Sequence, residues 1–374
     1  MTLILNASIR CFLAPLLVFL GYGIMGAIQG QIVAQISAGI IGIIIFYVRF
    51  FRNLKKEAGS KLSLAGTMKT LLRYGLPLAV SAITAGFLPQ FFNTLLTQSV
   101  EFVNGANYTT ALGNFQAAVN FTVIITFFTV PIGTVLFPAF SKIKGKEENH
   151  ILKVVFQSSV KYGALLTIPV TLMIMVLSEP IVFAVVGTEY TQAPFFLTLY
   201  STIFLYAVLG NLSLGNFLNG QGKTEITMKL ALLNLGVGLL LGWTLIHQFG
   251  VVGLIVSNSI AGFPSLLLGL WWIRKHFGAT IDWMPSTKIF LASCIAAGAT
   301  YLVLSQLNSS YGIELIAGGI SFSLVYLVAA PLIRAVDKKD VHSLREMLSG
   351  LGPFSPIFNI PLSIIEKLSD VFKF

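Results

Sequence analysis

Charged residues are scarce in this sequence: Asp, Glu, Lys and Arg together make up 10% of its 374 residues. A soluble domain of average composition is about a quarter charged. Hydrophobic residues instead account for 55% of the chain. This composition excludes a soluble globular protein and directs attention to the apolar segments.

Cysteine, clustered histidine and embedded charge are also lacking. Cys11 and Cys294 both lie in apolar segments, so neither a disulfide framework nor a cysteine-based metal site is available. The four histidines are scattered over the connections, and none pairs with another at metal-ligand spacing. Because no ionisable residue lies deep within an apolar segment, an embedded acid/base pair has no candidate. We therefore expect no metal, no cofactor and no enzymatic activity.

Long uncharged runs are abundant. Ten stretches of 17 to 29 residues contain no Asp, Glu, Lys, Arg or His: 11–28, 31–48, 74–98, 112–140, 162–178, 194–218, 230–246, 250–273, 289–306 and 315–333. A helix needs about 20 apolar residues to cross the hydrocarbon core. Barrel strands would alternate in polarity instead of running continuously apolar. The sequence predicts an all-α, polytopic transmembrane helical bundle of ten spans.

Basic residues alternate between the connections. All 24 Lys and Arg lie before the first span, in every second connection, or after the last span. The positive-inside rule therefore predicts a multi-pass protein of the cytoplasmic membrane with both termini in the cytoplasm. The net charge of +10 is explained by this topology and by attraction to anionic headgroups. We expect membrane lipids, and not nucleic acid, as partners.

The basic connections also contain two amphipathic segments. Within 61–73, Leu64, Met68, Leu71 and Leu72 share one helical face, which predicts a short interfacial helix on the cytoplasmic surface. The tail after Arg334 ends in apolar residues at helical spacing, which predicts a second interfacial helix.

Amide side chains within the spans are the candidates for a substrate cavity. Gln90 and Asn93 share one face of span three, and Gln116 and Asn120 share one face of span four. Further along the chain are four more amides, Asn211, Asn216, Asn234 and Asn258. Such residues either line a polar, uncharged cavity for sugar hydroxyls or headgroups, or hold helices together by hydrogen bonds. We favour the cavity for the two pairs and packing for any residue taken singly.

Five short blocks follow one another along the chain: LRYGLPL at 72–78, ALGNFQAA at 111–118, VLFPAFSK at 135–142, SEPI to VGTEY at 178–190, and NGQGKT at 219–224. Together they resemble the polysaccharide-biosynthesis flippases of the multidrug/oligosaccharidyl-lipid/polysaccharide exporter superfamily, which also contains the MATE-like exporters. The blocks fall in the expected order and on matching sides of the membrane.

The resemblance implies a MATE-like flippase fold of two six-helix lobes, with two additional helices at the C-terminal end. On this correspondence the first four helices are absent and the N-terminal lobe is incomplete. The implied divisions are the last two helices of the N-terminal lobe at 1–50, a cytoplasmic interfacial linker at 51–73, the C-terminal six-helix lobe at 74–273, two additional helices at 274–334, and a cytoplasmic tail at 335–374.

The implied function is transport of a polyprenyl-linked oligosaccharide or polysaccharide precursor across the cytoplasmic membrane by alternating access. Because half of the cavity wall would be missing, we expect the chain to be a fragment, to work with a partner chain, or to oligomerise. Two other functions stay open. One is a cation-coupled multidrug-type exporter, which would need an acidic residue in a span; the other is a non-transporting membrane subunit.

Cysteine accessibility tests the predicted topology. In a variant with Cys11 and Cys294 replaced by alanine, we expect Asn104→Cys and Asn308→Cys to react with a membrane-impermeant maleimide in intact cells. Both positions lie in connections without Lys or Arg, which the positive-inside rule places outside. Protection of both cysteines until the cells are lysed would reject the orientation.

Overall fold

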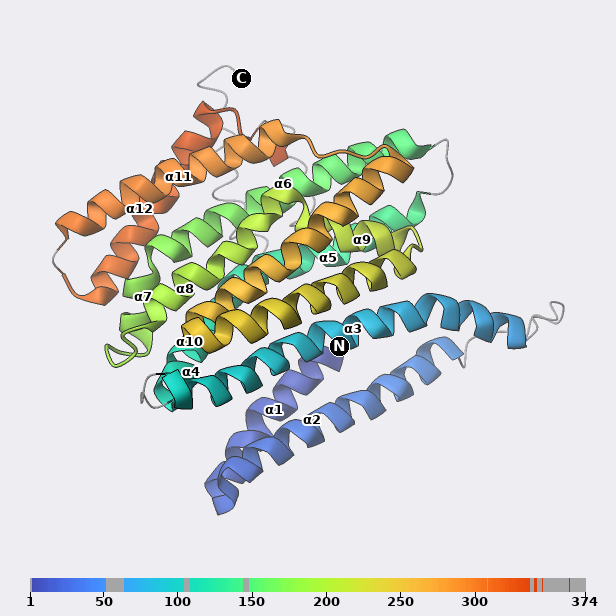
Figure 1. Ribbon diagram of the computed structural model, residues 1–374, viewed down its shortest axis with the longest axis horizontal. Helices are drawn as coiled ribbons and strands as arrows, with labels where there is room; N and C mark the ends of the chain where they lie inside the picture. The colour runs from blue at the N-terminus through green and yellow to red at the C-terminus, as the bar shows by residue number, and fades with distance from the viewer. Residues whose placement is uncertain are drawn as a thin grey trace. The chain divides into compact units, whose positions relative to one another are not determined.

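The computed structural model describes residues 2–51, 64–103, 108–143, 148–307, 309–336, 340–341, 345 and 363. Every regular element in these ranges is helical (Figure 1). Seven helices are long and apolar enough to cross a membrane, or eight if one bent pair counts as a single span. The predicted all-α, polytopic membrane bundle is therefore confirmed.

The chain divides into two compact units, Met1–Thr67 and Met68–Phe374. In the first unit the elements are α1 (Thr2–Leu17), the π-helical turn η1 (Val18–Tyr22), α2 (Gly23–Phe46) and the π-helical turn η2 (Tyr47–Phe51).

Small residues join α1 and α2 into an antiparallel pair. The chain leaves helical geometry at Gly21, whose φ is 94°. Four small residues at every fourth position of α2 are buried, namely Gly26, Gly30, Ala34 and Ala38. A Cβ at Gly30 would lie 2.7 Å from the Cα of Ala14. The two backbones therefore approach each other closely, as membrane helices do where small residues recur.

The second unit begins within α3 (Leu64–Val103). It continues with α4 (Tyr108–Phe121), α5 (Val123–Lys142), α6 (Asn149–Val176), α7 (Ser178–Val185), α8 (Ala193–Ser201), the 3₁₀ helix η4 (Thr202–Leu209), α9 (Asn211–Gly220), α10 (Thr224–Phe277), α11 (Trp283–Gln306) and α12 (Tyr311–Leu332).

The 54-residue helix α10 reverses direction at Gly250. A straight helix of this length would extend for about 80 Å, far more than the roughly 30 Å hydrocarbon core. Gly250 has φ 55° and ψ −125°, and a Cβ at Gly253 would collide with the backbone of Leu245. α10 therefore consists of two apolar segments that fold back on each other. The apolar stretch Leu5–Arg49 is likewise interrupted, at Gly21.

A second kind of break separates η4 from α9. The two apolar halves, Ala193–Leu209 and Asn211–Gly220, meet at an angle of 53°. Gly210 at the junction has φ 76°, a conformation that favours glycine. A Cβ there would lie 2.9 Å from a methyl group of Val160. The predicted span 194–218 is thus a broken helix.

One expected element differs from the structure. The segment 64–73 is not a separate interfacial helix, because α3 continues from Leu64 to Val103 through Pro77 and Pro89. Gly75 lacks the positive φ that ends helices elsewhere in this chain. Because no residue with a positive φ interrupts the helix here, each further residue that joins it gains a backbone hydrogen bond. Residues 61–63, and the predicted tail helix except Ser363, lie outside the described residues.

Aromatic and aliphatic side chains fill the interior of the second unit. Phe217 of α9 contacts Phe140 of α5 and Phe156 of α6, with ring centroids 5.1 Å and 5.5 Å apart. Elsewhere α11 lies beside α12 and packs on α6 (Figure 1). Val336 and Val341, which follow α12 in the chain, are buried together with apolar residues of α6, α11 and α12.

An ion pair joins this following segment to α6. Lys161 Nζ lies 2.6 Å from Asp340 Oδ2, and the Tyr162 hydroxyl donates to Asp340 Oδ1 at 3.3 Å. The two charged side chains are only 20% and 5% exposed. In the sequence Lys161 directly precedes the uncharged stretch 162–178, and the structure places it in the middle of α6.

Glycine substitutions in α10 test the close helix packing. Gly238 and Gly242 lie against Leu88 and Phe92 of α3, and a Cβ at Gly242 would overlap the ring of Phe92. Because Phe92 is 1% exposed, its ring has no free space to enter. We expect Gly242→Ala to destabilise the protein by about 1–3 kcal/mol, measured by thermal unfolding in detergent. Gly236→Ala is the control, since nothing lies within 4 Å of its Cβ position. Equal unfolding midpoints would contradict the packing.

A double-mutant cycle tests the ion pair. Asp340→Ala leaves a mostly buried ammonium without its carboxylate, which we expect to cost about 3 kcal/mol of unfolding free energy. Lys161→Met combined with Asp340→Leu removes both charges and should restore most of that stability. If the double variant were as unstable as Asp340→Ala, lost packing and not the stranded charge would explain the effect.

Candidate functional site

The first predicted amide pair lies on the outer part of the second unit. Gln90 is exposed on α3, and Asn93, one turn further on, is partly buried. Their backbone carbonyls accept hydrogen bonds from Thr94 and Thr97 at 2.9 Å and 2.6 Å. Thr94 and Thr97 thus bond to the α3 backbone and not to these amide side chains.

The second pair forms a contact within α4. Gln116 and Asn120 are both exposed, and Gln116 Nε2 donates to Asn120 Oδ1 at 3.2 Å. Asn120 lies twelve residues after the start of α4, about 18 Å along the helix axis. An exposed amide at that depth needs water, a ligand or another protein surface, because hydrocarbon offers no hydrogen-bond partner.

The other four predicted amides are dispersed. Asn211 is exposed, and Asn216 donates to the Leu212 carbonyl of its own helix at 2.9 Å. Asn258 forms a side-chain hydrogen bond with Tyr200. The Oδ1 atom of Asn234 is buried and has no hydrogen-bond partner among the described residues. Among the described residues, Gln116 and Asn120 are the only two of the eight candidates that a hydrogen bond joins to each other.

Two further amides hold helix ends together. The buried Asn114 of α4 accepts from the N–H groups of Gln192 and Ala193 at 3.1 Å and 3.0 Å, at the start of α8. Gln221 donates to the carbonyls of Phe140 and Ile143 at 2.6 Å and 3.0 Å, at the end of α5. These amides satisfy backbone groups that have no partner within their own helix. Their role is structural.

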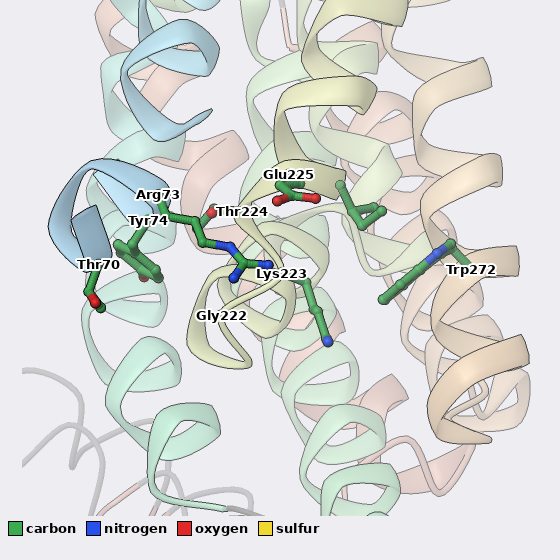
Figure 2. Close-up of a pocket in the computed structure, with 9 residues that line it drawn as sticks. Thr70, Arg73, Tyr74, Gly222, Lys223, Thr224, Glu225 and Trp272 are labelled. Carbon is green, nitrogen blue, oxygen red and sulfur yellow. The ribbon is translucent and has the colours of Figure 1, made fainter. Parts of the chain in front are cut away.

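The structure adds a pocket that the amide pattern did not indicate. Its volume is about 400 Å³, and it lies where α3 passes the turn between α9 and α10 (Figure 2). Thr70, Arg73 and Tyr74 line it from α3. The turn contributes Gly222 and Lys223, and α10 contributes Thr224, Glu225, Ile226 and Trp272.

Local geometry gives the pocket its shape. Gly222 has φ 69°, which turns the chain sharply before α10 begins. The hydroxyl of Tyr74 donates to the Asn219 carbonyl at 3.0 Å, and the hydroxyl of Thr227 donates to Asn219 Oδ1 at 2.8 Å. Asn219 therefore connects α3, the turn and the first turn of α10.

Sequence patterns contained a partial signal for this pocket. Arg73 and Tyr74 belong to the block at 72–78, and Gly222, Lys223 and Thr224 belong to the block at 219–224. Each block is a weak signal on its own, and the proximity of the two blocks follows only from the fold. No group of three or more His, Cys, Asp or Glu able to hold a metal occurs within the described part of the chain.

Comparisons with protein families cover most of the chain in two overlapping parts. The family model described as polysaccharide biosynthesis protein matches residues 1–144. The family model described as MatE matches residues 85–244.

Two archaeal proteins are similar to this chain at low identity. The probable low-salt glycan biosynthesis flippase Agl15 of Haloferax volcanii is 22% identical over 62% of this chain and 49% of its own length. An uncharacterized membrane protein of Methanocaldococcus jannaschii is 20% identical over 83% of this chain and 61% of its own length. The chain thus spans about half to three-fifths of these relatives.

Among solved structures, the inward closed conformation of the lipid II flippase MurJ superposes with a TM-score of 0.64. The match covers 87% of this chain and 66% of the flippase, at 19% sequence identity. At this identity the match describes the fold alone, which is MurJ-like.

Proposed function

We propose that this chain is a membrane transporter of the superfamily that contains the polysaccharide biosynthesis and MATE proteins, and that it moves a lipid-linked glycan across the membrane. The superfamily consists of transporters and not enzymes. The observation that carries the proposal is the MurJ-like fold together with the similarity to a relative named as a glycan biosynthesis flippase.

The proposed substrate is a polyprenyl-linked oligosaccharide or polysaccharide precursor. The amides of α3 and α4 suit such a substrate because sugar hydroxyls need neutral donors and acceptors. The exposure of Gln90, Gln116 and Asn120 within apolar helices supports a water-filled path, since lipid would leave these groups without hydrogen bonds. Transport would proceed by alternating access, with the path opening to one side of the membrane at a time.

We further propose ten spans with both termini in the cytoplasm. The reversals at Gly21 and Gly250 support two crossings within each of the long apolar stretches, and the bent pair at Gly210 supports one broken crossing. The distribution of Lys and Arg supports the orientation.

The proposed lobe assignment follows the same correspondence. Residues 1–50 would be the last two helices of the N-terminal lobe, 74–273 the C-terminal lobe, and 274–334 the two additional helices. The MurJ-like match covers 66% of the flippase, so about a third of that protein lies outside the match. The remaining cavity wall would come from a partner chain, a second copy or a longer form of the protein.

The MATE match raises a second candidate, a cation-coupled multidrug-type exporter. Such an exporter would hold its coupling cation on an acidic side chain within a span. The ten uncharged stretches contain no Asp or Glu. The composition of the spans therefore favours the glycan flippase.

Replacing the paired amides tests the proposed cavity. We expect the quadruple variant Gln90→Leu, Asn93→Leu, Gln116→Leu and Asn120→Leu to insert and fold, because leucine is favourable in lipid. Glycan export per folded molecule should fall partially, since recognition is spread over several weak contacts. Export is measured in cells that also supply the remaining helices of the N-terminal lobe.

The matched control is Gln98→Leu, an exposed amide of the same helix that is not one of the four proposed cavity residues. It should leave export unchanged. If the four amides instead serve packing, folded yield should fall, because each lost interhelical hydrogen bond is worth about 0.6–2 kcal/mol. Normal export by the folded quadruple variant would refute the cavity.

A further inference from the structure

The start of α10 presents unsatisfied hydrogen-bond donors to the pocket between α3 and the turn at Gly222. The first backbone bonds of α10 are donated by Ile226 and Thr227, both to the Lys223 carbonyl, at 3.0 Å and 3.3 Å. Within the described part of the chain, the N–H groups of Thr224 and Glu225 have no backbone acceptor. Lys223 at the N-cap position makes no side-chain capping bond. The helix dipole adds partial positive charge at this end.

Thr224 supplies an independent observation. The residue is only 2% exposed and lines the pocket, and the structure describes no hydrogen bond of its hydroxyl. A hydroxyl normally bonds to protein or water, and the Thr224 hydroxyl is not among the fully buried side-chain atoms that lack a partner. In Figure 2 the labelled Thr224 lies beside Arg73, on the side of α10 that faces α3. The Thr224 hydroxyl is therefore available to donate a hydrogen bond to a ligand in the pocket.

Two basic side chains, those of Arg73 and Lys223, add to the hydrogen-bond donors that line the pocket. Arg73 reaches from α3 across to the turn, where Lys223 immediately precedes α10 (Figure 2). The structure describes no ion pair for either side chain. Glu225 is the one acid that lines the pocket, so the side chains contribute a net charge of +1. Backbone N–H groups, a guanidinium, an ammonium and a hydroxyl together form a typical arrangement for binding a tetrahedral oxyanion.

We propose that this pocket binds a phosphoryl group. A phosphoryl group offers several oxygen acceptors to the donors of Arg73, Thr224 and the first turn of α10. The volume of about 400 Å³ accommodates a headgroup larger than one phosphate. The binder is a phosphoryl-bearing lipid headgroup or a soluble phosphorylated compound, and both present the same chemistry.

Neighbouring residues place the pocket at the depth of lipid headgroups. Tyr74 and Trp272 line it, and Lys275 Nζ lies 5.0 Å from the ring centroid of the adjacent Trp271. Aromatic residues with basic neighbours are enriched where membrane helices meet water. Phosphoryl binding does not depend on glycan transport, so it is measurable whatever the substrate of the protein.

Binding is measured on the purified full chain with two probes. The first is inorganic pyrophosphate added to protein in neutral detergent. The second is phosphatidic acid in phosphatidylcholine nanodiscs. The signal is the fluorescence of Trp272 in a background where Trp243, Trp271 and Trp283 are phenylalanine, because only Trp272 lines the pocket. We expect saturable binding of at least one probe, weakened by salt.

Four variants separate the pocket from general surface charge. Arg73→Gln should weaken binding at least about tenfold, as expected for loss of a charge-assisted hydrogen bond. Thr224→Val keeps the side-chain shape and should weaken binding about fivefold. Glu225→Gln should strengthen binding about threefold by removing the opposing charge. The control is Arg274→Gln, an exposed arginine of α10 that does not line the pocket, and it should bind as the parent does.

The outcomes are distinct. A variant-sensitive response to phosphatidic acid alone supports a lipid headgroup, and one to pyrophosphate alone supports a soluble phosphorylated compound. No saturable response to either probe, or equal losses in Arg73→Gln and Arg274→Gln, overturns the proposal. Each variant is compared at equal folded content, taken from its thermal unfolding curve. A failed glycan-export assay would leave these results unaffected.

Discussion

Backbone hydrogen bonding in lipid is the constraint on which the rest of this structure depends. Each N–H and C=O within the hydrocarbon must find its partner inside the chain, so every regular element described is a helix. The chain can then change direction only where the helical pattern is released. It does so at Gly21 and Gly250, and it bends at Gly210, positions where positive φ values are tolerated because glycine has no Cβ.

The helices are held together by close approach more than by the hydrophobic effect, because lipid is as apolar as their side chains. Because Gly30 has no side chain, the backbone of Ala14 can pack directly against it. In the same way Leu88 and Phe92 pack against Gly238 and Gly242. Larger gaps are filled by aromatic clusters such as the one around Phe217. One buried ion pair, between Lys161 and Asp340, secures the segment after α12.

Helix ends are where this architecture acquires polar chemistry. Asn114 and Gln221 bond backbone groups that their own helices leave unpaired, and both serve stability. At the start of α10 no side chain performs this task, and the free donors meet Arg73 from α3. The neutral amides within the helices and the cationic groups at the start of α10 fit the proposed glycan substrate and the proposed phosphoryl ligand.

The sequence by itself determined the fold class, the lack of acids in the ten apolar stretches and the resemblance to the flippase superfamily, because these depend on composition, hydropathy and short blocks. It did not determine that 64–73 continues into the following span, since that depends on whether a helix meets a local stop. The proximity of Arg73 to Thr224 was also decided by the tertiary structure alone. These residues lie on different helices, and only packing through Gly238 and Gly242, with the Tyr74 to Asn219 hydrogen bond, brings them to one pocket. Side-chain partners across helices depend on rotation and register, which no local sequence pattern specifies.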